Sequence, residues 1–193
     1  MNDIRTDDAP PAASKHTSDA LETARASLPE AEGNSLVARA VTINRPAPEL
    51  YAYWRDFANL ASFMDNVERI ETLDNERSHW VVKGPGGRTV EWDARVTEDV
   101  ANRRIAWASE EGADIANSGT VDFRDAGARG TVVTATLLYD PPAGTVGKII
   151  AKMFQREPAI QARRDLRRFK QLMETGEIAT SSRTRAQLNE ERN

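Results

Sequence analysis

The feature that most limits how this chain can fold is a change of hydrophobic period near residue 140. From residue 67 to residue 139, apolar and polar residues alternate in short runs separated by turn-forming residues, which is typical of antiparallel β-strands. After Pro141 and Pro142, apolar residues recur at intervals of three and four, as on one face of a helix. The pattern therefore predicts an antiparallel sheet that packs against one long terminal helix.

Seven strands and two short helices are predicted before that long helix. The strands cover residues 36–43, 67–73, 79–83, 89–98, 104–109, 117–125 and 131–139. Pro48 opens the first short helix, where its missing N–H is not needed, and Leu50 and Trp54 follow at helical spacing. A second helical turn carries Phe63 and Met64. These two short helices are expected to close one end of the sheet.

The long helix is predicted from an apolar stripe that stops before Gly176, a residue type common just past helix ends. The stripe consists of Ala159, Ala162, Leu166, Phe169 and Met173. Pro158 predicts a kink or a short break before it. A large sheet with one bare face is unfavourable, so we expect the sheet to curl around this helix. The expected result is an α+β fold with a cavity between the curved sheet and the helix.

The two ends of the chain differ from the middle in composition. Residues 1–34 contain seven acidic and three basic residues and few apolar residues larger than alanine. Such a segment cannot bury enough apolar surface to offset the entropy lost on ordering it. We therefore predict a folded ligand-binding domain at residues 35–178, flanked by disordered tails at 1–34 and 179–193.

Composition excludes several classes of site. The 193 residues contain no cysteine, which excludes disulfides, zinc–thiolate sites and iron–sulfur clusters. No run approaches the ~18 apolar residues of a membrane-spanning helix, and the N-terminus lacks the apolar region of a secretory signal, so we expect a cytoplasmic protein. The net charge of −4 does not favour nucleic acid as a partner, and neither a metal nor another cofactor is indicated.

Segments spread over about three-quarters of the chain resemble a known group of proteins. They are INRP at 43–46, YWRDFANL at 53–60, FM at 63–64, WAS at 107–109, NSGTVDF at 117–123, GT at 130–131, LYDPP at 138–142 and DLRRFKQLMETGE at 165–177. With these segments the chain resembles the SRPBCC (START-related) superfamily, within it the polyketide cyclase/dehydrase and lipid-transport group near the coenzyme-Q-binding proteins. The resemblance implies a helix-grip fold, in which a curved seven-stranded antiparallel sheet wraps around a long C-terminal helix. It does not decide between a carrier and an enzyme.

Candidate ligand-binding residues are the apolar side chains on the predicted concave face of the sheet and on the helices that face it. They are Trp54, Phe63, Met64, Trp80, Val82, Trp92, Ala94, Ile105, Trp107, Val121, Phe123, Val133, Ala135, Leu137, Met153 and Ile160. Aromatic and apolar walls are typical of ligand pockets, although filling the core explains each tryptophan equally well. We predict a binding or carrier protein for a small hydrophobic molecule, such as a lipid, a quinone or a polyketide-like compound.

The alternative function is a polyketide cyclase/dehydrase-type enzyme, which would need a titratable group inside the same cavity. His79 is the one histidine in the predicted folded domain, but it shares a strand face with Val81 and Lys83, which favours a surface position. Glu91 and Asp93 are likewise expected to point outward, where they improve solubility. No residue is therefore assigned a catalytic or metal-binding role, and the prediction leans towards a protein that is not an enzyme.

The predicted long helix is also strongly basic. Between Lys148 and Lys170 there are eight basic and two acidic residues, a net charge of +6. A solvated face opposite the apolar stripe accounts for this charge. The same charge would also suit a peripheral contact of helix 148–170 with an anionic membrane surface, or docking of the acidic tail at residues 1–34. The sequence carries no indication of oligomeric state.

Overall fold

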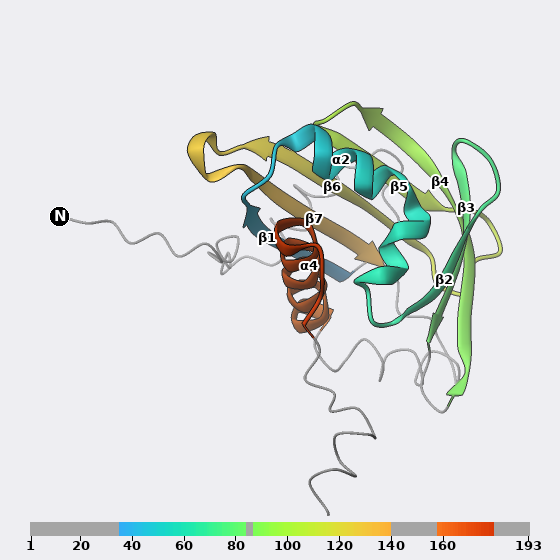
Figure 1. The fold of residues 1–193 in the computed structure, drawn as a ribbon. Coiled ribbons are helices and arrows are strands. Elements are labelled where there is room, and N and C mark those ends of the chain that lie inside the picture. The colour runs from blue at the N-terminus through green and yellow to red at the C-terminus, as the bar shows by residue number, and fades with distance from the viewer. Residues whose placement is uncertain (1–34, 84–86, 140–157, 180–193) are drawn as a thin grey trace, which may run out of the picture.

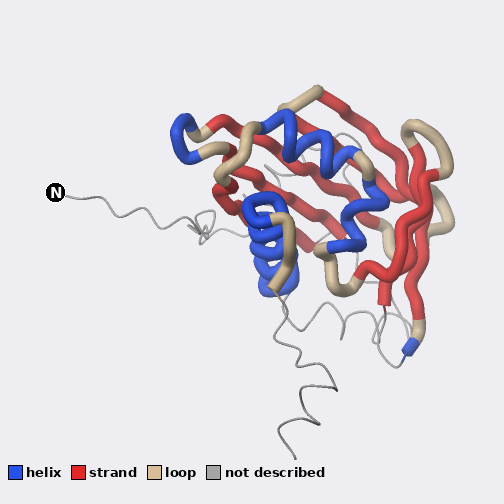
Figure 2. Tube along the Cα trace, in the orientation of Figure 1, coloured by secondary structure: helices blue, strands red, loops and turns tan. Residues whose placement is uncertain are grey.

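A computed structural model describes residues 35–83, 87–139 and 158–179, and it has the form of a strongly curved sheet with helices on its concave side (Figure 1). The elements are β1 (Ser35–Ile43), α2 (Ala47–Arg55), η1 (Phe57–Ser62), β2 (Val67–Thr72), β3 (Arg77–Lys83), β4 (Thr89–Val100), β5 (Arg104–Ser109), β6 (Asn117–Asp125), η3 (Gly127–Arg129), β7 (Thr131–Tyr139) and α4 (Pro158–Thr175). Helices α2, η1 and α4 lie along the inside of the curve, as the tube in Figure 2 shows. This arrangement confirms the predicted α+β helix-grip fold with a curved seven-stranded sheet.

The sheet is antiparallel throughout, in the order β1-β7-β6-β5-β4-β3-β2. Strands β2 to β7 pair with their neighbours in sequence, and β1 joins the sheet beside β7, from Ser35 opposite Tyr139 to Ile43 opposite Thr131. The pairing register shifts in β2 between Val67 and Arg69 and in β4 between Val96 and Glu98. Such irregularities bend a strand and increase its twist, which helps the sheet to curl.

Differences from the predicted elements are confined to their ends. β4 continues to Val100, two residues beyond the predicted end, and the second short helix is a 3-10 helix that stops before Phe63. Pro158 is the first described residue of α4, so the predicted kink or break before it stays a prediction. The predicted tails at residues 1–34 and 179–193 lie outside the described residues except for residue 179, so those predictions stay predictions.

An aromatic cluster joins the helices on the inside of the sheet. The ring centroids of Phe63 and Phe169 are 4.9 Å apart, and Trp54 meets Phe169 edge to face at 5.1 Å. Trp54 also contacts Phe123 of β6 at 6.4 Å, so the cluster reaches from α4 through α2 to the sheet. Phe63 and Phe169 are completely buried. The burial of these rings is the main apolar contact that holds α4 inside the curve.

Polar contacts fix the C-terminal half of α4 to the first strand and the segment after it. Lys170 Nζ donates to the backbone carbonyl of Thr42 at 2.6 Å, and the guanidinium of Arg45 donates to the carbonyl of Glu174 at 2.9 Å. The Glu174 carboxylate in turn accepts the backbone N–H of Asn44 at 2.7 Å. Together these bonds determine how α4 lies across β1. Within the described residues, no helix is long and apolar enough to cross a membrane.

We predict that Phe169→Ala strongly destabilises the fold. Removing a fully buried phenylalanine from a packed cluster costs about 3–5 kcal/mol, because apolar contacts are lost and a cavity remains. Urea unfolding followed by circular dichroism would measure this loss. Arg164→Ala, at an exposed position on the same helix, is the control and should change stability by less than about 0.5 kcal/mol. A loss of under about 1 kcal/mol for Phe169→Ala would contradict the role given to the cluster.

Candidate ligand-binding site

A cavity of about 250 Å³ lies between the concave face of the sheet and helix α4. Its walls come from almost every element of the fold, including the loop before β2 and the loop before β6. The lining residues are Val37, Trp54, Phe57, Leu60, Met64, Asn66, Val67, Trp80, Val82, Trp92, Trp107, Ile115, Asn117, Ala135, Thr136, Leu137, Tyr139, Gln161, Ala162, Asp165 and Leu166. Most are apolar or aromatic, with a few polar groups among them, as is usual for small-molecule pockets.

Small residues on the sheet leave room for this cavity and for the ring of Trp107. A Cβ atom at Gly119 would lie 2.4 Å from Cζ2 of Trp107 and 2.6 Å from the carbonyl oxygen of Thr136. No side chain fits in that space, so the Trp107 ring packs directly on the Gly119 backbone. Ala135 on β7 and Ala162 on α4 are the other short side chains in the walls. A larger residue at any of these positions would fill or narrow the cavity.

The aromatic walls are well ordered by their own contacts. Trp80 and Trp92 face each other across β3 and β4, with ring centroids 5.9 Å apart and planes 10° from parallel. The indole N–H of Trp80 donates to Ser78 Oγ at 2.9 Å, so this polar atom is satisfied within the strand. All four tryptophans of the chain, including Trp54 and Trp107, line the cavity. The cavity therefore offers flat aromatic surfaces to an apolar guest.

Asp165 is the one carboxylic acid among the described residues that line the cavity. Its Oδ1 accepts the side-chain N–H of Gln161 at 2.8 Å. Burial, the largest cause, raises the pKa of Asp165 to about 7, and the nearby carboxylate of Asp65 adds to the rise. The hydrogen bonds from Gln161 and from the backbone of Asp65, together with the charge of Arg168, oppose this rise in pKa. Asp165 therefore exchanges its proton near neutral pH.

Sequence reasoning missed this carboxyl group, since it named no titratable side chain for the cavity. In the basic segment from Lys148 to Lys170, Asp165 is one of only two acids. It lies three residues after Ala162 and directly before Leu166, two members of the apolar stripe. A charged residue beside that stripe on the buried side of a helix is the feature that predicts a carboxyl group in the cavity.

Eight of the predicted ligand-binding residues line the cavity and six lie elsewhere. Those in the walls are Trp54, Met64, Trp80, Val82, Trp92, Trp107, Ala135 and Leu137. Those buried outside the walls are Phe63, Ala94, Ile105, Val121, Phe123 and Val133. Of the last two predicted residues, Met153 lies outside the described residues, and so does the side chain of Ile160. The buried set includes Phe63 and Phe123, both in contact with Trp54, so part of the predicted face is filled by core packing.

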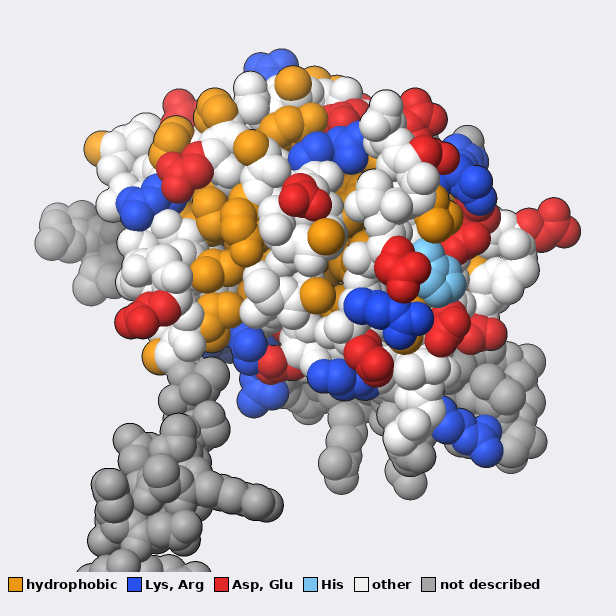
Figure 3. All heavy atoms as spheres, turned by 45° about the vertical axis from the view of Figure 1, so that its right-hand side comes forward, with side chains coloured by type: hydrophobic (Ala, Val, Ile, Leu, Met, Phe, Trp, Pro, Cys, Tyr) orange, Lys and Arg blue, Asp and Glu red, His pale blue; other side chains and the backbone are white. Residues whose placement is uncertain are grey.

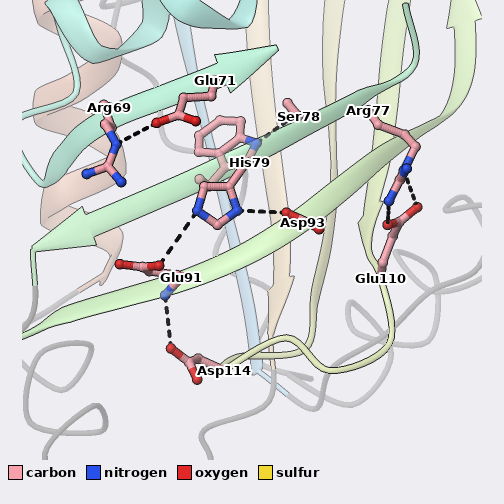
Figure 4. A network of polar contacts seen from close by, with 10 residues as sticks. Arg69, Glu71, Arg77, Ser78, His79, Glu91, Asp93, Glu110 and Asp114 are labelled. Atoms are coloured by element: carbon pink, nitrogen blue, oxygen red, sulfur yellow. Dashed lines mark hydrogen bonds and ion pairs between the residues drawn. The ribbon is translucent and has the colours of Figure 1, made fainter. Parts of the chain in front are cut away.

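The polar network around His79 lies on the outer surface of the sheet. Figure 4 shows His79 Nδ1 bonded to Asp93 Oδ1 at 2.7 Å, with Glu91 3.7 Å from Nε2. The space-filling view places the histidine among acidic side chains at the surface (Figure 3). These positions agree with the surface roles predicted for His79, Glu91 and Asp93. Within residues 35–83, 87–139 and 158–179, no group of three or more His, Asp or Glu could hold a metal ion.

A second hollow lies at the turn between β1 and α2 and is less suited to an apolar ligand. It measures about 740 Å³ and opens widely to solvent. Its lining consists of Asn44, Arg45, Pro46, Ala47, Pro48, Glu49, Asp125, Gly127, Ala128, Gly130 and Thr131. These residues come mainly from turns and include no aromatic side chain. The aromatic-lined cavity beneath α4 is therefore the better candidate site.

Comparisons with known proteins agree with this architecture. The model of a family described as polyketide cyclase/dehydrase and lipid transport matches residues 43–167. An uncharacterized 17.2 kDa protein of Streptomyces lincolnensis is 30% identical over 141 residues, which are 72% of this chain and 90% of that protein. A solved structure from Deinococcus radiodurans is 44% identical, with a TM-score of 0.62 and coverage of 75% of this chain and 100% of that one. The Zhui aromatase/cyclase of Streptomyces sp. R1128 has the same fold at 18% identity, with a TM-score of 0.59 and coverage of 75% and 99%.

We predict that Asp165→Asn stabilises the protein increasingly as pH rises. An ordinary Asp pKa is 3.8, so in the window from there to about 7 the folded state holds a proton that the unfolded chain has lost. Raising pH through this window therefore lowers the stability of the wild type, and asparagine removes the effect. After discounting for partial exposure, the gain at about pH 8 should be roughly 2 kcal/mol, against little change near pH 4.

Thermal unfolding at several pH values would measure this difference. Asp56→Asn, at an exposed carboxylate outside the cavity, is the matched control and should show no such pH-dependent gain. A gain for Asp165→Asn that is equal at both ends of the window would mean that ionisation of this carboxyl is not the cause.

Proposed function

The chain belongs to the polyketide cyclase/dehydrase and lipid transport family, and we propose that it binds one small hydrophobic molecule in the cavity beneath α4. The observation that carries this proposal is the wall of aromatic side chains, to which Trp54, Trp80, Trp92 and Trp107 all contribute. A core without a ligand would be expected to fill such a space, because empty volume forfeits dispersion contacts. Sixteen ligand-binding residues were predicted from the sequence. The eight of them that line the cavity are the proposed binding residues.

The size of the cavity favours a compact ligand. Its volume of about 250 Å³ is slightly below the ~300–1,000 Å³ of pockets that hold drug-sized molecules. A lipid with two long acyl chains does not fit in this volume, whereas a compound of two or three fused rings does. The rings of Trp80 and Trp92 lie nearly parallel, and they favour a flat ligand that can stack against an aromatic surface. A quinone or a polyketide-like ring compound matches both features.

The second candidate function is catalysis of the cyclase or dehydrase type in the same cavity, and Asp165 is the observation that favours it. General acid–base catalysis works best with a group whose pKa lies near the working pH. The pKa of Asp165 is raised to about 7 by burial, and the carboxyl group faces the space where a substrate would lie. It is the residue proposed to move a proton in such a reaction. Conversion of a bound ketone to a new product would distinguish this function from carriage alone.

The exposed face of α4 is proposed to make a peripheral contact with anionic membranes. Arg163, Arg164 and Arg167 are exposed there, while Arg168 and Lys170 form ion pairs with Asp65 and Glu174. The bases Lys148, Lys152 and Arg156, which were counted in the same predicted patch, lie outside the described residues. A carrier that docks on a lipid surface through this helix would hold its cavity close to the source of its ligand.

We predict that ethylnaphthalene binds in the cavity and quenches the intrinsic tryptophan fluorescence of the protein. Because all four tryptophans line the cavity, fluorescence titration reports on this site directly. Ala135→Phe should fill the cavity and weaken binding by at least about tenfold. Val100→Phe adds the same side chain at an exposed position, 40% accessible, and should leave binding unchanged. Binding that survives Ala135→Phe, and also a second filling variant Ala162→Phe, would contradict the proposed site.

We also predict that replacing Arg163, Arg164 and Arg167 by glutamine weakens binding to anionic vesicles. A base near a charged bilayer contributes up to about 1 kcal/mol, so the loss should exceed tenfold. Sedimentation with phosphatidylcholine vesicles that contain phosphatidylserine would measure it. The control variant carries the same charge change at three other exposed arginines, Arg88, Arg103 and Arg129. Equal binding by both variants would show that the face of α4 has no special role.

A further inference from the structure

We propose that Asp165 and Gln161 make the cavity select uncharged carbonyl compounds and reject anionic amphiphiles such as fatty-acid carboxylates. This inference rests on the proposed function, that the cavity holds a hydrophobic ligand. It concerns the chemistry of that ligand, which the apolar walls alone do not determine. The basis is the polar part of the lining, half of which lies on one turn of α4 and in the loop before β2.

Asp165 and Gln161 form one polar unit on the cavity side of α4. They lie four residues apart, one turn along the same helix face, and both line the cavity. Gln161 Nε2 uses one N–H to reach Asp165 Oδ1 at 2.8 Å, and an amide of this kind carries a second N–H. Asn117, another amide in the lining, likewise uses one side-chain N–H, but its partner is the backbone carbonyl of Ile115 at 3.0 Å and not a carboxyl group. Gln161 and Asp165 are therefore the better candidates for a paired polar contact with a ligand.

The hydrogen bonds given to Asp165 use its oxygens as acceptors and do not engage its own proton. Asp165 accepts hydrogen bonds from the side chain of Gln161 and from the backbone of Asp65, and both of these partners are donors. When Asp165 carries a proton, its O–H is therefore available to donate to a ligand in the cavity. A buried donor without an acceptor is unfavourable, so the site favours a guest that supplies one. A ketone or quinone oxygen supplies an acceptor and brings no charge.

The charges around Asp165 disfavour an anionic guest. The lining contains no Lys, Arg or His among the described residues, so a ligand carboxylate would have no cation to pair with inside the cavity. Two charged groups face Asp165, and they already pair with each other: Arg168 forms an ion pair with Asp65. Lys83 Nζ also lies on the Asp65 side, 3.3 Å from its backbone carbonyl. A second carboxylate beside Asp165 would therefore be buried without compensation.

The test uses three naphthalenes of nearly equal shape, substituted at the same ring position. Acetylnaphthalene carries an uncharged carbonyl group, ethylnaphthalene carries no oxygen, and naphthoate is an anion. Fluorescence titration of the full chain measures the affinity of each probe at about pH 6 and about pH 8, on either side of the pKa of Asp165. The variants are Asp165→Leu, which removes the polar group at similar size, and Asp165→Asn, which keeps a donor that does not ionise.

The wild type should bind acetylnaphthalene about tenfold more tightly than ethylnaphthalene at about pH 6, and naphthoate more weakly than both. This preference should shrink at about pH 8, because an ionised Asp165 no longer donates to the ketone. Asp165→Leu should lose the preference at both pH values, whereas Asp165→Asn should keep it at both. Circular dichroism would confirm that each variant is folded. Gln161→Leu, which leaves the carboxyl in place, should lower the preference without removing its pH dependence.

Equal affinity for the ketone and the hydrocarbon, or tightest binding of naphthoate, would overturn the inference. Binding of ethylnaphthalene in either case would leave the proposed hydrophobic cavity standing. If none of the three probes binds, the proposed function itself fails, and the inference about its ligand fails with it. The two failures therefore give different results in the same titration.

Discussion

The rest of the structure depends on the packing of one helix inside one curved sheet, and Phe169 is central to that packing. Its ring lies 4.9 Å from Phe63 and 5.1 Å from Trp54, so a single side chain of α4 joins the helix to α2 and to the residue that follows η1. Because these contacts lie toward the C-terminal end of α4, they keep that half of the helix tightly packed. The N-terminal half, with Gln161 and Asp165, lies over the cavity instead. The cavity is thus a consequence of where the aromatic cluster ends.

The sequence predicted the fold well because the strongest constraint, alternation along strands, is local. Residues such as Trp80 and Val82 share a face whatever the rest of the chain does, so the residues of the concave face could be predicted from the sequence. Which residues of that face border the cavity and which are buried beneath a helix could not be predicted in this way. Val121 and Phe123 point to the same side as Ala135, yet they are buried under α2 while Ala135 borders the cavity. Which part of a face is filled depends on the size of side chains on another element, and strand alternation carries no information on that.

Asp165 illustrates why functional groups are harder to predict than cores. A carboxyl group that must give up solvation weakens the fold as pH rises, as the increase of its pKa to about 7 indicates. Its nearest neighbours stabilise the charge only in part, since Arg168 is shared with Asp65. A leucine at this position would fit the apolar stripe and add to the core. A polar group retained at a loss of stability is a feature expected of a binding or catalytic site.

The faces of α4 combine these roles in one element. Leu166 and Phe169 bind the helix to the core, Gln161 and Asp165 border the cavity, and Arg164 and Arg167 are exposed to solvent. Residues three and four apart share a face, so core, site and surface alternate along fewer than ten residues. A shift of this helix would therefore move the Asp165 carboxyl relative to the tryptophan walls.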